Sequence, residues 1–262
     1  MQQPKFFIPT GAWNVRAGIS PQQVLDAARK ADASGIDGLF AGDHVTFYGS
    51  GNDGLINLAA VAAVTERLEL MTSVYLLALR HPTPVALQCA MIDQLCLGRL
   101  ILGVGIGGED ANEWWACGVD PKTRGRRTDE SLAIMRSLWT NEETTFDGKY
   151  FKVDKVRMQP KPFRETGVTV HVGGRSDAAL KRTARFGDAW MSIWISARRM
   201  QEAGDRIAEL AVEEGRDPAS ITKGIQLWHS VALDGDRDAA KARLSRRMEG
   251  FYKIPYHRFE RY

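Results

Sequence analysis

The stretch RLILGVGIGGEDANEW, residues 99–114, decides what kind of fold this sequence encodes. An apolar run over residues 100–104 predicts a buried strand, and Gly103, Gly105 and Gly108 follow the spacing G-x-G-x-x-G. This spacing is typical of dinucleotide-binding loops, but it also arises often at the end of any buried strand. Two alternatives follow: a dinucleotide site on a doubly wound sheet, or a glycine-rich strand end that serves another cofactor in another fold.

The composition is ordinary for a globular protein. The chain has 262 residues and a formal net charge of +3, with 44% hydrophobic and 26% charged residues. This small charge gives no reason to predict nucleic-acid binding. No apolar run reaches the roughly 18 residues that a membrane-spanning helix needs, and the N-terminal segment lacks the features of a secretory signal. We therefore expect a cytoplasmic protein with no nucleic-acid or membrane partner.

Short apolar runs alternate with amphipathic helical patterns along the chain. Four of the predicted helices follow a residue suited to N-capping, namely Ser20, Ser176, Ser196 and Asp236. Segment 144–162 interrupts the alternation and predicts a β-hairpin with a type I′ turn at Asp147-Gly148. The predicted strands lie in segments 5–11, 36–44, 68–77, 99–107, 168–174, 188–195 and 221–233.

Repeated strand–helix units build either a doubly wound sheet or an eightfold barrel. The unbroken run of units, with no linker or shift in composition, favours the barrel, whose typical length is about 250 residues. We predict one α/β domain over residues 1–262, a (β/α)8 TIM barrel with the hairpin inserted between units four and five. The count stops before the final strand–helix unit, so we expect this sequence to be a C-terminally truncated form of a longer chain.

The active site of such a barrel lies at the carboxyl ends of its strands. Gly173, Gly174, Arg175 and Ser176 follow the fifth predicted strand. The glycines would admit an anion to backbone N–H groups at the start of the next helix, which Ser176 would cap, and Arg175 could add a charge-assisted bond. This segment is a candidate phosphate site, and the alternative is that its glycines only form a tight turn.

Asp43 and His44 follow the second predicted strand and are the candidates for proton transfer. Histidine titrates near neutral pH, and an adjacent carboxylate can orient its surroundings. The alternative is a structural histidine. Glu109 is a candidate second acid or base, although a charge at a helix N-terminus is the commoner role of such a residue. Trp13 and Trp194 lie at strand ends and are candidates for a substrate pocket.

Other common chemistries find little support in the sequence. The histidines are scattered with no H-x-H or H-x-x-x-H spacing, so no metal site is predicted. The G-x-S-x-G motif of hydrolases does not occur in the sequence either. A glycine-rich and aromatic strand-end region suits a bound organic cofactor.

Several segments together resemble the luciferase-like monooxygenase superfamily. The resemblance covers nearly the whole chain, in the order and spacing of that family. It implies a (β/α)8 barrel that binds reduced FMN or the deazaflavin coenzyme F420, and a homodimer. The segments are GLFAGDHV (38–45), MTSVYLLALRHPTPVALQ (71–88), GRLILGVGIGGEDANE (98–113), RRTDESLAIMRSLW (126–139), TFDGKYFKV (145–153) and VHVGGRSDAALKRTARFGDAW (170–190).

Smaller features are similar to the deazaflavin branch of that superfamily. They include Asp-His after strand two, Thr-Ser-Val after strand three, and Glu109 followed by an asparagine three residues later. This resemblance implies a non-prolyl cis peptide between Ser73 and Val74, and it gives His44 the acid or base role with Glu109 in support. The contacts that it implies with the deazaflavin are Asp43, Ser73, Val74, Leu76, Gly107, Gly108 and Asn112, with Gly173, Gly174 and Ser176 at its phosphate.

The chain departs from the deazaflavin-dependent glucose-6-phosphate dehydrogenases of that branch. Their pattern has a lysine just past strand six, where this chain has Ile195-Ser196, and an acid near strand one, where it has residues 10–13. We therefore expect a more apolar substrate that faces Trp13 and Trp194.

Three hypotheses of function follow. The leading one is an oxidoreductase that transfers a hydride between F420 and a small organic substrate. The second is a two-component monooxygenase that uses reduced FMN and oxygen. A separate flavin or deazaflavin reductase is a candidate partner of the enzyme. The third is a non-catalytic flavin-binding protein.

Overall fold

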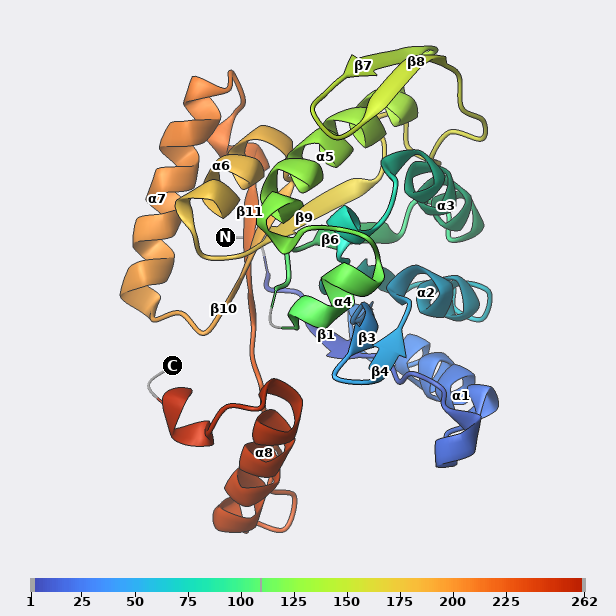
Figure 1. Ribbon diagram of the computed structural model, residues 1–262. Coiled ribbons are helices and arrows are strands. Elements are labelled where there is room, and N and C mark those ends of the chain that lie inside the picture. The colour runs from blue at the N-terminus through green and yellow to red at the C-terminus, as the bar shows by residue number, and fades with distance from the viewer. Residues whose placement is uncertain (1–2, 109, 261–262) are drawn as a thin grey trace.

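Seven parallel strands form the framework of the molecule (Figure 1). The structure is a computed structural model that describes residues 3–108 and 110–260. Consecutive strands pair in parallel, as expected for strand–helix units. In spatial order the strands are β1 (Phe7–Pro9), β2 (Gly38–Ala41), β5 (Glu69–Thr72), β6 (Leu100–Val104), β9 (Thr169–Gly173), β10 (Ala189–Ile193) and β11 (Thr222–Gln226).

Helices surround the sheet on its outer side (Figure 1). The predicted caps are confirmed, because the side chains of Ser20, Ser176, Ser196 and Asp236 each accept a hydrogen bond from the first turn of the helix that follows. The helices are α1 (Pro21–Asp32), α2 (Gly54–Ala62), α3 (Pro82–Leu95), α4 (Ala111–Ala116), α5 (Arg124–Thr140), α6 (Asp177–Phe186), α7 (Ala197–Glu213) and α8 (Arg237–Tyr252). Short 3-10 turns lie at Val15–Ala17, Leu77–Leu79, Pro121–Thr123, Pro218–Ser220 and Tyr256–Arg258.

The core lies between the strands and the helices around them. Every residue of β6 is buried, as is typical of a central parallel strand covered on both faces. Leu70, Leu102 and Val170 from three neighbouring strands are fully buried in one cluster with Leu58 of α2. Their burial fixes the strands against the helices, and so fixes the positions of the loops at the strand ends.

Two antiparallel pairs lie outside the main sheet. The first, β3 (His44–Phe47) with β4 (Ser50–Asn52), directly follows β2 and was not predicted. The second, β7 (Thr144–Asp147) with β8 (Lys152–Val156), lies between α5 and β9.

The predicted type I′ turn of the second pair is wrong. Asp147 pairs with Lys152, and the Gly148 N–H donates to the Phe151 carbonyl at 2.9 Å, so residues 148–151 form a longer loop. The cause is Glu130 of α5, whose carboxylate accepts hydrogen bonds from three successive backbone N–H groups, those of residues 149–151, at 2.8–3.2 Å. The conformation of this turn is therefore set by Glu130, which lies 20 positions before Tyr150 in the sequence.

The strands β1 and β11 are the edges of the sheet in the described part of the chain. The seven strands form a half-barrel within an α/β fold. The eighth strand–helix unit stays a prediction. Helix α8 lies past the carboxyl end of β11, shown in red in Figure 1. Within residues 3–108 and 110–260, no helix is long and apolar enough to cross a membrane.

Candidate functional site

The glycines of residues 103–105 allow the chain after β5 to lie close to β6. The Tyr75 N–H donates to the Gly103 carbonyl at 2.7 Å, and the Gly105 N–H donates to the Tyr75 carbonyl at 3.1 Å. A Cβ atom on Gly103 would lie 2.0 Å from the Thr72 carbonyl oxygen, and one on Gly105 would lie 2.3 Å from Val74 Cγ2. Close contact between two strand ends therefore explains this spacing without a dinucleotide.

Val74 lies between the glycines of two strand ends. The Ser73–Val74 peptide bond is cis, which confirms that prediction. On the side of β9, a Cβ atom on Gly173 would lie 3.1 Å from Val74 Cγ1. Gly107 and Gly174 have positive φ angles of +49° and +123°, a region that favours glycine. The result is a surface around Val74 that has few side chains and could receive a flat ring.

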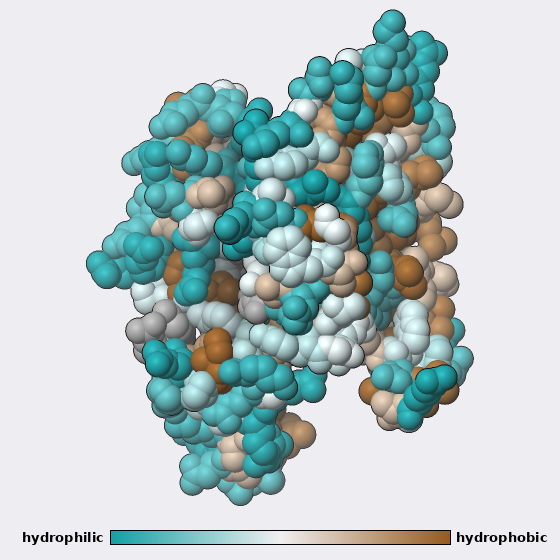
Figure 2. All heavy atoms as spheres, viewed as in Figure 1, coloured by the Kyte–Doolittle hydropathy of each residue, from teal (hydrophilic) through white to brown (hydrophobic). Residues whose placement is uncertain are grey.

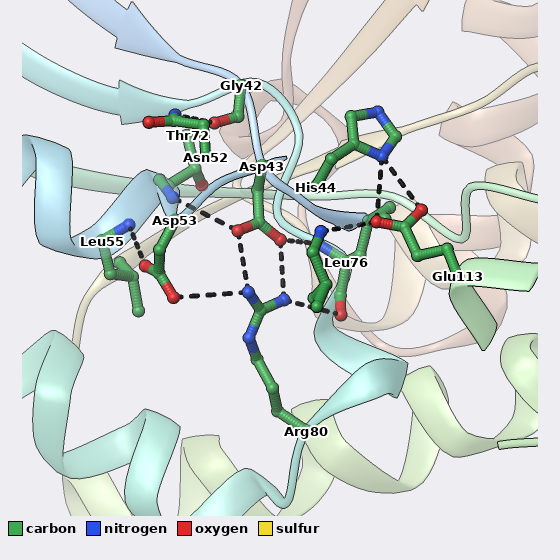
Figure 3. Close-up of polar contacts among 12 residues, drawn as sticks. Gly42, Asp43, His44, Asn52, Asp53, Leu55, Thr72, Leu76, Arg80 and Glu113 are labelled. Carbon is green, nitrogen blue, oxygen red and sulfur yellow. Dashed lines mark hydrogen bonds and ion pairs between the residues drawn. The ribbon is translucent and has the colours of Figure 1, made fainter. Parts of the chain in front are cut away.

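His44 is held by a buried carboxylate from a distant part of the chain (Figure 3). Its Nδ1 lies 3.0 Å from Glu113 Oε2, and the Glu113 side chain is only 2% exposed. Glu113 Oε1 also accepts from the backbone N–H groups of Val45 at 2.5 Å and Thr46 at 3.3 Å. The Glu113 carboxylate therefore fixes both the His44 ring and the start of β3, and it leaves Nε2 on the opposite side of the ring.

Asp43 faces a different set of partners from its neighbour His44 (Figure 3). Its two carboxylate oxygens accept from Arg80 Nη1 and Nη2 at 2.7 and 2.9 Å, and from the N–H groups of Leu76 and Gly54. Burial raises the pKa of Asp43, and Arg80 and these two N–H groups act against the rise. Arg80 also forms an ion pair with Asp53 at 3.3 Å. In this structure Asp43 anchors the segment after β5 to the loop after β2.

The glycine-rich loop after β9 begins a helix, as predicted. Ser176 caps α6, and the Gly174 carbonyl accepts from Trp190 Nε1 at 2.7 Å. The Arg175 side chain is exposed, and its Nη1 donates to the Trp194 carbonyl at 2.5 Å. This bond ties the loop after β9 to the end of β10.

The remaining predicted residues differ in how far they are exposed. Leu76 is buried, whereas Gly108 and Asn112 are exposed, and Asn112 lies in the first turn of α4. Trp13 is partly buried after β1. Glu109 lies outside the described residues. One functional candidate that the sequence did not predict is Glu113, four residues further along the chain.

Aromatic rings from the C-terminal part of the chain gather beside His44 and Trp194. We call Trp194, Trp228, Phe251, Tyr252 and Phe259 the aromatic cluster. Trp194 lies 4.5 Å from Tyr252 and 4.7 Å from Phe259 between ring centroids. Phe251 lies 6.4 Å from His44 and 5.7 Å from Trp228. Of these five residues the sequence predicted only Trp194 as a site residue, because it lies at the end of a predicted strand, whereas Trp228 lies within the predicted strand 221–233 and the other three lie beyond it.

The fold and this site define the class of protein: a barrel-type α/β fold with a glycine-lined surface, a carboxylate-bound histidine and aromatic rings at the carboxyl ends of its strands. No three or more His, Cys, Asp or Glu side chains gather to hold a metal ion within the described ranges. The family model described as luciferase-like monooxygenase matches residues 5–261. The chain belongs to this family.

The relatives by sequence include F420-dependent glucose-6-phosphate dehydrogenases. The protein from Kineococcus radiotolerans is 32% identical over 232 residues, which cover 85% of this chain and 67% of the relative. The protein from Nakamurella multipartita is 28% identical over 250 residues, which cover 84% and 71%.

Solved structures show the same fold. An F420-dependent secondary alcohol dehydrogenase in complex with an F420-acetone adduct matches with a TM-score of 0.80 and 25% identity, over 94% of this chain and 74% of that one. Monooxygenase RslO1 from Streptomyces bottropensis matches with a TM-score of 0.81 and 24% identity, over 95% and 80%.

Proposed function

We propose that this chain is an F420-dependent oxidoreductase that acts on a small organic substrate at the carboxyl ends of its strands. The observation that supports the proposal is that His44, held by Glu113, and Val74, with glycines around it, follow the carboxyl ends of the neighbouring strands β2 and β5. The F420-dependent dehydrogenases among the relatives and solved structures support it.

The residues around Val74 fit a flat ring and a charged tail. Gly105 and Gly173 have no side chains that would cover Val74. Ser176 and Gly174 lie at the N-terminus of α6, where backbone N–H groups favour a phosphate. When bound there, F420 would supply a hydride acceptor or donor at its C5 position. The other contacts in this proposal are Asp43, Ser73, Leu76, Gly107, Gly108, Asn112 and Arg175.

His44 would hold or move the proton that accompanies the hydride. Because Glu113 binds Nδ1, the free side of the ring presents Nε2 to a ligand. Phe47 stacks on the same ring with centroids 4.1 Å apart, and this contact restricts the ring further. His44 would thus act as the acid or base, and Glu113 would position it. The predicted supporting role of Glu109 remains a proposal.

A parallel titration with F420 and FMN tests the proposal. We expect low-micromolar binding of F420 and much weaker binding of FMN, followed by fluorescence. His44→Ala should still bind F420. Its turnover of a panel of alcohols and ketones should be lower than that of the wild type by about 100-fold or more. A preference for FMN would instead favour the oxygen-dependent monooxygenase with its reductase partner. Turnover that survives in His44→Ala would remove His44 from the mechanism.

We also propose a homodimer that forms through the outer face of α2 and α3. Ile56 of α2 and Met91 and Leu95 of α3 are 52–62% exposed, and brown, hydrophobic atoms appear along this flank in Figure 2. Exposed apolar side chains that gather on one flank are candidates for an interaction surface. Met91→Glu with Leu95→Lys should halve the molar mass measured by light scattering, whereas Leu233→Lys, at another exposed leucine, should not. The cytoplasmic location stays a prediction.

A further inference from the structure

We propose that the aromatic cluster and the cavity beside it bind an apolar ring of the substrate, so that the substrate class is a cyclic ketone or the corresponding secondary alcohol. The reaction itself is the one given under the proposed function, on which this inference rests. The cavity would recognise the ring of the substrate.

The cavity has the size of one small ring. Its volume is about 150 Å3, and it is partly open to solvent, whereas an enclosed apolar cavity of about this size can hold benzene. Most of its lining is apolar. The lining residues that matter here are Trp194, Leu227, Trp228, Leu244, Met248 and Phe259.

The cavity lies next to the residues of the proposed reaction. Gln226 at the end of β11 lines it, and the Gln226 Oε1 accepts from Ser73 Oγ at 3.3 Å. On the other side, Phe251 contacts both His44 and Trp228. Only Gln226 would therefore separate a ring in the cavity from Ser73. Trp228 and Phe251 would separate the same ring from His44.

The chemistry of the lining selects against a sugar phosphate. Among the described residues that line the cavity there is no lysine or arginine, and Glu260 is an acid. Glu260 is itself paired with Lys241, whose Nζ lies 2.7 Å from Glu260 Oε1, so a phosphate in the cavity would have to compete with this carboxylate for that cation. An apolar ring, in contrast, gains from leaving water and from packing against aromatic faces.

One polar group of the cluster lacks a partner. Trp194 Nε1 is buried and has no hydrogen-bond acceptor among the described residues. A buried donor without an acceptor is costly, and an oxygen atom on a ligand could relieve that cost only if the Trp194 ring turns its Nε1 towards the cavity. An apolar ring that carries one carbonyl or hydroxyl oxygen would suit the cavity and this donor together.

Leu227 allows a test that leaves the core intact, because its side chain lines the cavity and is still 65% exposed. The probes are cyclohexanone and acetone, and their dissociation constants are measured by ligand-observed NMR on the purified chain. We expect cyclohexanone to bind at least about 10-fold more tightly than acetone, since added methylene groups in an apolar pocket have effects of this size. Leu227→Trp should fill the cavity and remove that preference.

Leu233→Trp is the matched control, since Leu233 is 94% exposed in the same segment and does not line the cavity. It should keep the preference for cyclohexanone. Leu227→Ala should widen the cavity and shift the preference towards acetophenone. Equal affinities for cyclohexanone and acetone, or equal effects of both tryptophan variants, would overturn the inference.

An F420 titration on the same samples separates this inference from the proposed function. F420 binding without a preference for cyclohexanone would overturn the ring-binding cavity alone. A preference for cyclohexanone that Leu227→Trp removes, without F420 binding, would support the cavity and overturn the proposed cofactor.

Discussion

Glu113 Oε2 lies 3.0 Å from His44 Nδ1, and the two residues are 69 positions apart in the sequence. The same carboxylate also accepts from the backbone N–H groups of Val45 and Thr46, which follow His44 in strand β3. A single buried side chain thus sets the orientation of the ring and the path of the strand. This arrangement resembles the way in which acids orient catalytic histidines in other enzymes.

Glu113→Gln should lower kcat by at least about 10-fold, because the neutral amide orients the ring less firmly and cannot balance a proton on it. Binding of F420 should change little. Glu109→Gln is the matched variant, since Glu109 is the residue that the sequence predicted in this supporting role. A larger loss of kcat in Glu109→Gln than in Glu113→Gln would reverse the assignment.

Gly105→Ala should weaken F420 binding and lower the free energy of unfolding by about 1–3 kcal/mol, because its Cβ would lie 2.3 Å from Val74 Cγ2 and force that side chain to move. Adding Val74→Ala removes both Cγ atoms and should recover part of the stability. Gly35→Ala is the control, since a Cβ there would have no neighbour within 4 Å. Urea denaturation and fluorescence titration provide the measurements. If Gly105→Ala and Gly35→Ala have the same F420 affinity and the same free energy of unfolding, the close contact between Gly105 and Val74 has no importance.

Asp43→Ala should lower the free energy of unfolding by about 3 kcal/mol, because it leaves Arg80 with a largely buried charge and only Asp53 as an acid partner. The exposed Glu202→Gln, which removes the ion pair with Arg198, should have no measurable effect. Urea denaturation at neutral pH compares the two. If Asp43→Ala retains stability but loses F420 binding, the carboxylate serves the cofactor and not the fold.

The fold was largely predictable because its signals are local. Seven apolar runs and the capping residues Ser20, Ser176, Ser196 and Asp236 mark the repeated units, and each signal depends on neighbours within a few residues. The β3–β4 pair was missed because its strands are short and follow β2 with almost no break. The turn after β7 was predicted wrongly because Glu130, on another helix, determines it.

The site was less predictable because its contacts are distant in sequence. Asp110 and Glu113 have the spacing of a residue pair that caps a helix, and Asp110 does cap α4. The Glu113 side chain instead reaches residues 44–46, and nothing near it in the sequence indicates that contact. Likewise, the adjacent residues Asp43 and His44 meet entirely different partners, which the order of residues alone does not reveal.

His171 on β9 should make the protein less stable in mild acid. Burial lowers the pKa of this side chain from 6.5 to about 4, against the opposing effect of Asp188 and Glu69. The folded protein therefore holds His171 neutral, whereas the unfolded chain takes up a proton as the pH falls through about 6.5. Its contribution to stability is complete above that pH and is lost progressively down to about pH 4.

The comparison of wild type with His171→Gln isolates this effect from the carboxylates that titrate in the same range. The difference between their free energies of unfolding should be constant above about pH 7 and should shift by about 3 kcal/mol against the wild type by about pH 4. Below that pH the difference should be constant again, because His171 is then protonated in both states. Urea denaturation at half-unit steps of pH measures the curve. A difference that stays flat from pH 7 to 4 would mean that His171 is accessible to water in the folded protein and that this face of β9 is open to solvent.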